Sequence, residues 1–155
     1  NVLPWAGFAV AYEYYPEGLY NVLHAYGERY PTLPLVVSES GIATEVGDRR
    51  AANIVRALEQ IERARAEKVD IRGYYYWSLT DNFERVERLG PRFGLYSDDY
   101  APYERTPTLG AEVLGKIAET RKLSQEYRDL YGGTGPMTPE GTFGPRTLCS
   151  GKDLP

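Results

Sequence analysis

The chain has 155 residues, of which 42% are hydrophobic and 26% are charged, a balance typical of a folded globular protein. Its formal net charge of -4 would repel a phosphate backbone, and no segment has the roughly 18 apolar residues of a membrane span, so we expect neither nucleic acid nor membrane as a partner. One cysteine, Cys149, and one histidine, His24, exclude an internal disulfide and a histidine-rich metal site. We therefore predict no metal and no cofactor. The compartment stays open, with the cytoplasm favoured.

The first predicted elements are a helix and a buried strand. Leu19, Leu23 and Tyr26 recur at helical spacing after Pro16, which suits the first turn of a helix. Residues 33–40, LPLVVSES, form a short apolar run that is rich in β-branched residues and ends in polar ones. This pattern indicates a buried strand.

A long amphipathic helix and a second strand follow. Residues 69–79, VDIRGYYYWSL, are β-branched and aromatic throughout and predict another buried strand. A strand, a helix and a strand over about 45 residues make a βαβ unit, whose right-handed crossover makes the two strands parallel. The helix is predicted over residues 49–68, where one face carries Ala51, Ile54, Val55, Leu58, Ile61 and Ala64.

The last third of the chain predicts one more helix and an irregular tail. Thr106 and Pro107 suit the N-cap and first turn of an outer helix that continues to Leu123. Residues 132–155 are dense in glycine and proline and show little apolar periodicity, so we expect irregular structure there.

Polar and aromatic residues gather where the two predicted strands end. Glu39 follows the first strand, and Trp77 and Glu84 follow the second. Ligands of parallel sheets bind at the carboxyl ends of the strands, and sugars combine faces that stack on aromatic rings with hydroxyls that need acceptors. We interpret Asp81 and Asn82 as residues that shape the loop through hydrogen bonds to the backbone.

At these residues the chain resembles glycoside hydrolase family 1, the β-glucosidase and β-galactosidase family. The family's nucleophile motif, I/V-T-E-N-G, is matched by residues 37–41, VSESG, and its last-strand motif is matched by residues 73–85, GYYYWSLTDNFER. R-F-G-L follows at residues 92–95, and EYYPEGLYNVL resembles an upstream segment of the family. The motifs stand in the family's order between about residue 12 and about residue 121.

The resemblance implies an α/β fold in which residues 1–131 form the last two strands and flanking helices of a TIM (β/α)₈ barrel. It also implies a retaining β-glycosidase, in which one carboxylate attacks the sugar and a second, about 5 Å away, serves as acid and base. Glu39 matches the nucleophile, Trp77 the floor of the sugar site and Glu84 an acceptor for sugar hydroxyls. Phe93 matches a nearby aromatic residue. The implied substrate is a β-glycoside or oligosaccharide.

Three positions depart from the family pattern. Arg85 stands where the family usually has Trp, and its guanidinium can stack on a sugar or bind an anionic group. Ser40 replaces the amide that usually follows the nucleophile, and the N-E-P motif that carries the family's acid/base does not occur. These departures leave two alternatives to a glycosidase, namely a non-catalytic sugar-binding relative and a structural barrel half without a ligand.

Two strands with three or four helices would leave strand edges unpaired. We therefore expect the chain to pair with an N-terminal segment of the same barrel, present as a separate chain, which would supply the acid/base.

Overall fold

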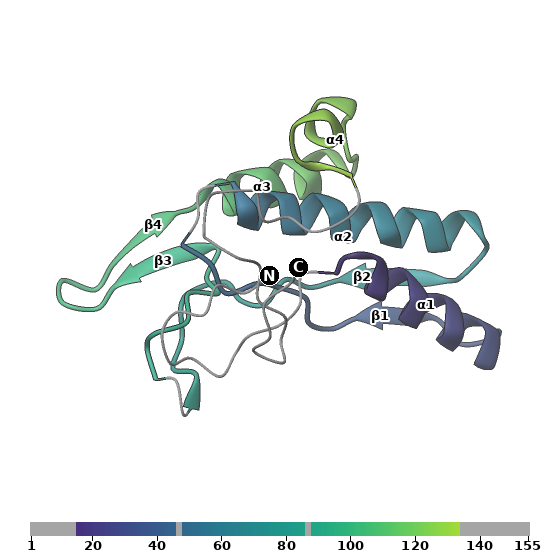
Figure 1. Ribbon diagram of the computed structural model, residues 1–155, viewed down its shortest axis with the longest axis horizontal. Coiled ribbons are helices and arrows are strands. Elements are labelled where there is room, and N and C mark those ends of the chain that lie inside the picture. The colour runs from purple at the N-terminus through teal and green to yellow at the C-terminus, as the bar shows by residue number, and fades with distance from the viewer. Residues whose placement is uncertain (1–14, 46–47, 86–87, 134–155) are drawn as a thin grey trace, which may run out of the picture.

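The computed structural model describes residues 15–45, 48–85 and 88–133. In chain order the elements are α1 (Glu17–Arg29), β1 (Leu35–Val37), α2 (Arg49–Ala66) and β2 (Ile71–Tyr74). They continue with β3 (Tyr96–Asp99), β4 (Glu104–Pro107), α3 (Leu109–Thr120) and α4 (Gln125–Tyr131). Helix α2 lies at the centre of this arrangement and packs against α1, α3 and α4 (Figure 1).

The α2 sequence forms a helix with one apolar face, and that face is the core of the molecule. Ala51, Ile54, Val55 and Ala64 have no exposed surface, as the predicted helix face requires. The amino-terminal half of α2 packs against Val113 of α3, and its carboxyl-terminal half packs against α1 and the strands. Burying these side chains supplies the main stabilising free energy of this part, at about 1.5–3 kcal/mol for each large one.

Strands β1 and β2 are parallel neighbours, which confirms the predicted βαβ unit. Leu35 pairs with Ile71 and Val37 with Tyr74, so the two strands end at the same edge. The side chains of Val37 and Ile71 are buried against α1 and α2. The described residues contain this parallel pair and the β3–β4 hairpin, and they form no closed barrel.

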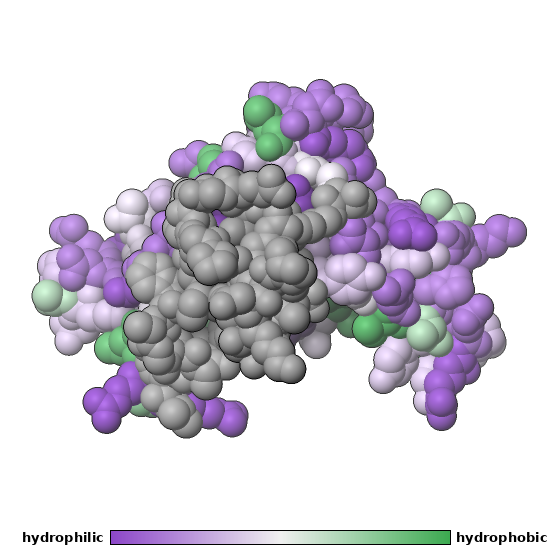
Figure 2. All heavy atoms as spheres, in the orientation of Figure 1, coloured by the Kyte–Doolittle hydropathy of each residue, from purple (hydrophilic) through white to green (hydrophobic). Residues whose placement is uncertain are grey.

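The two parallel strands are shorter and less buried than the sequence predicted. Val36 is 53% exposed and Tyr75, just beyond β2, is 63% exposed. One face of each strand meets the helices, and within the described ranges nothing covers the other. On the face shown in Figure 2, outside the grey atoms, hydrophobic residues appear in separate spots among hydrophilic ones.

The β3–β4 hairpin was not predicted, and it moves the start of the last helix. Thr106 and Pro107 belong to β4, and the N-cap of α3 is Thr108, whose side chain accepts a hydrogen bond from the Ala111 amide. Helix α3 ends at Thr120 because Arg121 adopts a left-handed conformation with φ of 53°. A separate helix, α4, begins at Gln125, beyond Leu123, where the predicted helix was expected to end.

The hairpin extends away from the helices at the left of Figure 1. Of the tail predicted over residues 132–155, only the first two residues lie within the described ranges. None of the described helices is both long and apolar enough to cross a membrane.

Candidate active site

The loops that follow β1 and β2 are joined by backbone hydrogen bonds. The Tyr75 amide donates to the Val37 carbonyl, and the Trp77 amide donates to the Ser40 carbonyl, each at 2.9 Å. Gly41 permits this close approach, because a Cβ there would lie 1.9 Å from the carbonyl oxygen of Trp77. The loop that carries Glu39 is therefore fixed against the loop that carries Trp77.

A third segment, residues 92–96, runs beside the Trp77 loop. The Ser78 amide donates to the Phe93 carbonyl at 3.3 Å, and the Leu95 amide donates to the Ser78 carbonyl at 2.8 Å. Gly94 is confined between backbones, since a Cβ there would lie 2.2 Å from the Tyr96 carbonyl oxygen. This packing brings Phe93 next to residues that precede it by more than ten positions.

These three segments surround one open hollow of about 750 Å³. All five residues that the sequence predicted as catalytic or substrate-binding line it, and four further residues complete its wall. The predicted ones are Glu39, Trp77, Glu84, Arg85 and Phe93, and the others are Ser40, Gly41, Asn82 and Phe83.

The hollow combines aromatic surface with two carboxylates. The Trp77 indole Nε1 donates to Glu84 Oε1 at 3.3 Å, which fixes the indole relative to that carboxylate. Trp77 remains 38% exposed, whereas Phe93 is only 6% exposed and packs beneath the surface. Glu39 is exposed, and no hydrogen bond or ion pair joins its carboxylate to another described residue. A carboxylate of this kind is accessible to a ligand.

Ser40, next to Glu39, contacts a tyrosine of the second strand. The Tyr74 hydroxyl donates to Ser40 Oγ at 3.5 Å, a long hydrogen bond. Burial raises the pKa of the Tyr74 phenol above its usual value of 10.0, so this hydroxyl stays protonated at neutral pH and remains a donor. The serine at the departure from the family motif thus has a partner within the described chain.

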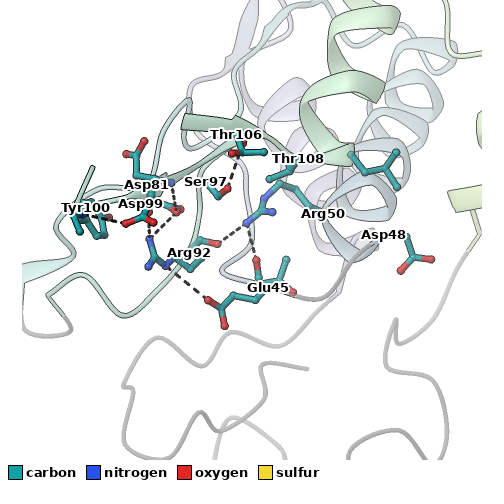
Figure 3. Close-up of a pocket in the computed structure, with 14 residues that line it drawn as sticks. Glu45, Asp48, Arg50, Asp81, Arg92, Ser97, Asp99, Tyr100, Thr106 and Thr108 are labelled. Atoms are coloured by element: carbon teal, nitrogen blue, oxygen red, sulfur yellow. Dashed lines mark hydrogen bonds and ion pairs between the residues drawn. The ribbon is translucent and has the colours of Figure 1, made fainter. Parts of the chain in front are cut away.

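A second hollow, of about 910 Å³, is lined by a different set of residues, and both of its arginines have protein partners. Arg92 lies between Asp81 and Glu45, with its Nη1 3.0 Å from Asp81 Oδ2 (Figure 3). Arg50 donates to the carbonyls of Thr44 and Arg92. We interpret this hollow as structural support, because its cations already have protein partners.

Asp81 is the centre of that support. Its side chain has no exposed surface, and its carboxylate accepts hydrogen bonds from the amides of Gly94 at 2.8 Å and Asp98 at 3.2 Å. The loop-shaping interpretation of Asp81 is therefore confirmed. For Asn82 it stays a prediction: Asn82 lines the hollow beside Glu84, and its Oδ1 is buried with no hydrogen-bond partner among the described residues. The described residues contain no cluster of His, Cys, Asp and Glu that could hold a metal ion.

Comparison with known proteins decides the family. The model of glycosyl hydrolase family 1 matches residues 3–123. The chain belongs to this family. Among its relatives, the β-galactosidase of Sulfolobus acidocaldarius is 46% identical over 128 residues, which cover 83% of this chain and 26% of that protein. The β-galactosidase of Saccharolobus solfataricus is 42% identical over 128 residues, which cover 83% of this chain and 26% of that protein.

Solved structures of the family also match. The β-glycosidase from Pyrococcus horikoshii aligns with a TM-score of 0.76 and 36% identity, covering 90% of this chain and 31% of that one. The β-glycosidase of Thermosphaera aggregans aligns with a TM-score of 0.73 and 31% identity, over 78% of this chain and 25% of that one. The resemblance to family 1 is thereby confirmed. The chain spans about a quarter of the length of the curated relatives it matches.

Proposed function

We propose that this chain carries the nucleophile half of a retaining β-glycosidase, with Glu39 as the nucleophile. The observation that carries the proposal is the position of Glu39, an accessible carboxylate at the end of a parallel strand, in a hollow with Trp77 and Glu84. Relatives named β-galactosidase support β-galactosides as substrates, and a relative named bifunctional β-D-glucosidase/β-D-fucosidase supports β-glucosides.

In the proposed reaction, a Glu39 oxygen attacks the anomeric carbon while the bond to the leaving oxygen breaks and an acid protonates that oxygen. Water then attacks the same carbon, gives its proton to the same group acting as base, and releases Glu39. The product keeps the β configuration because the carbon is inverted twice.

The other residues of the hollow would hold the sugar. The Trp77 indole offers an apolar face for the CH groups of the sugar ring. Its hydrogen bond to Glu84 fixes the two side chains relative to each other. Glu84 would accept hydrogen bonds from sugar hydroxyls far from the bond that breaks. Phe93 would support the floor from below, and Arg85 would contact the sugar at the rim.

We further propose that the acid/base comes from the other strands of a TIM (β/α)₈ barrel, which complete the site by packing against the described residues. Besides Glu39, the only described carboxylate that lines the hollow is Glu84, which is bonded to Trp77. The open faces at Val36 and Tyr75 are where further strands and side chains would pack. The share of the relatives that the chain spans supports the same interpretation.

The test is hydrolysis of an aryl β-glucoside by the protein assembled with the rest of its barrel. Glu39→Gln keeps the shape of the side chain but removes the nucleophile, and we expect the turnover rate to fall by on the order of 10⁴-fold or more. Glu45→Gln is the matched control, because Glu45 lines the second hollow and lies 3.8 Å from Arg92. Turnover that survives Glu39→Gln, or that falls equally in both variants, contradicts the proposal.

A further inference from the structure

Arg85 is the one basic residue among those that the structure places around the Glu39 hollow. Its side chain is exposed, and no hydrogen bond, ion pair or ring contact joins it to another described residue. Two carboxylates line the same hollow, yet neither forms an ion pair with Arg85 among the described contacts. Among the described residues, this guanidinium at the wall of the hollow therefore keeps its donors available.

Two other arginines of this region, Arg92 and Arg50, differ from Arg85 because their guanidinium groups have protein partners. Arg92 bonds to Asp81, contacts Glu45 and donates to the Asp98 carbonyl. Arg50 is buried, and its Nη2 donates to two backbone carbonyls. The guanidinium groups that hold this region together have protein partners, so the unpaired state of Arg85 is not the general condition of arginine here.

Glu84, the residue before Arg85, already has a hydrogen-bond partner. Glu84 Oε1 accepts the Trp77 indole hydrogen, and the loop after it is closed by backbone bonds from the Glu84 amide to the Arg88 carbonyl and from the Arg88 amide to the Arg85 carbonyl. The backbone that positions Arg85 is thus held, while its side chain faces solvent. A planar guanidinium with free donors binds two oxygens of a carboxylate or phosphate at once.

We propose that the sugar accepted by this hollow carries an anionic group, a carboxylate or a phosphate ester, which binds Arg85 beside Glu84. The inference rests on the proposed function, because it takes Glu39 as the residue at the anomeric carbon. The anionic group is bound and left unchanged by the reaction. Glu39 and Glu84 are the two carboxylates of the lining, and without Arg85 they would repel an anionic substrate. The anionic group avoids this repulsion only where it lies nearer to Arg85 than to either carboxylate.

The test compares three p-nitrophenyl glycosides with the assembled protein, namely the β-glucoside, the β-glucuronide and the β-glucoside 6-phosphate. We expect Arg85→Gln to lower kcat/KM for at least one anionic substrate by about 10- to 100-fold, chiefly through KM, as the loss of a charge-assisted hydrogen-bond pair predicts. The neutral glucoside meets the Arg85 side chain only through uncharged groups, so its kcat/KM should fall clearly less than that of the anionic substrate. Which anionic substrate responds identifies the carboxylate or the phosphate as the ligand.

Arg88→Gln is the matched control, because it is the same exchange three positions away at an exposed residue that does not line the hollow. It should leave all three substrates unchanged. Equal loss on neutral and anionic substrates after Arg85→Gln, or no loss on either anionic one, overturns the inference.

A binding measurement keeps this result separate from the proposed function. In the Glu39→Gln background, calorimetry with the glucuronide and the 6-phosphate should show tighter binding when residue 85 is Arg than when it is Gln. Equal affinities overturn the inference even if the protein turns over no substrate. Suppose that Glu39→Gln abolishes hydrolysis of the neutral glucoside and that Arg85→Gln affects neutral and anionic substrates alike. This result would uphold the proposed function and refute this inference alone.

Discussion

The helices around α2 and the loops around Glu39 are stabilised by different interactions. We call α1, α2 and α3 with β1 and β2 the helical layer, and residues 38–42, 75–85 and 92–96 the site loops. In the helical layer, Ile54 and Val55 are fully buried, and Val55 packs against Val113 of α3. In the site loops, the contacts are backbone hydrogen bonds, close approaches at glycine and the buried carboxylate of Asp81.

This difference has a functional consequence. Apolar packing is non-directional and fixes the position of an element only through shape, whereas hydrogen bonds between backbones fix the direction of each loop. A reacting carboxylate needs defined placement, and a small displacement is costly to the rate. Truncating a buried side chain of the helical layer should therefore lower stability and spare activity, whereas displacing a site loop should lower activity even where the helices stay folded.

The largest expected effect comes from Asp81→Ala in the site loops. It leaves Arg92 and the Gly94 and Asp98 amides without their acceptor in a buried position, so we expect the free energy of unfolding to fall by about 3–5 kcal/mol. Urea unfolding of the assembled protein measures this change. A loss below about 1 kcal/mol, the range of an exposed ion pair, would show that the site loops do not depend on Asp81.

Ile54→Ala tests the helical layer. Ile54 has no exposed surface, and its truncation should lower the free energy of unfolding by about 2–5 kcal/mol. The folded protein should keep its kcat/KM to within about 3-fold, because Ile54 does not line the hollow. A much larger loss of activity in the folded variant would break the proposed separation of the two regions.

Gly41→Ala makes the opposite perturbation. The added Cβ would force the Glu39 loop away from the Trp77 carbonyl, and we expect kcat to fall by about 10²-fold, the penalty of a displacement near 1 Å. Far-ultraviolet circular dichroism should show the helices intact. Retention of more than half of the wild-type rate would mean that the close approach at Gly41 is not needed for catalysis.

The smallest effect is expected for Gly115→Ala, the matched control for Gly41. A Cβ at Gly115 meets nothing within 4 Å, and the residue lies inside α3. Alanine should therefore raise the free energy of unfolding by about 0.5–1 kcal/mol, because it costs less conformational entropy in a helix. Thermal unfolding and the glycoside assay together check that stability rises while the rate stays unchanged. A fall in stability would reveal a contact of α3 with another part of the protein.

The sequence predicted the helical layer better than it predicted the site loops. The apolar face of α2 follows from its periodicity, and the parallel pairing of β1 and β2 follows from the helix between them. The β3–β4 hairpin escaped prediction because its strands, YSDD and ERTP, are polar and mostly exposed. The helix start predicted at Thr106 was wrong because Thr106 and Pro107 pair within the hairpin, which leaves Thr108 as the N-cap.

The candidate site was predictable where the family motif and the strand ends coincide. Glu39, Trp77 and Glu84 follow strands that end at one edge, so their meeting required only the parallel pairing. The contribution of Asn82 could not be predicted, because it depends on which of two neighbouring side chains, Asp81 or Asn82, is held by residues 92–98. The alignment of these two segments is set by hydrogen bonds between residues more than ten positions apart in the chain. Such bonds leave no recognisable pattern in the local sequence.

The measurement that tests the central claim most directly is the mass of a trapped intermediate. A 2-deoxy-2-fluoro β-glycoside with a good leaving group slows the second step more than the first, so a nucleophilic carboxylate retains the sugar. Proteolysis and mass spectrometry of the assembled protein should then place one sugar on the peptide that contains Glu39, and Glu39→Gln should prevent it. A sugar found on Glu84 or on another carboxylate, or an enzyme that turns over without forming any adduct, would contradict the assignment of Glu39.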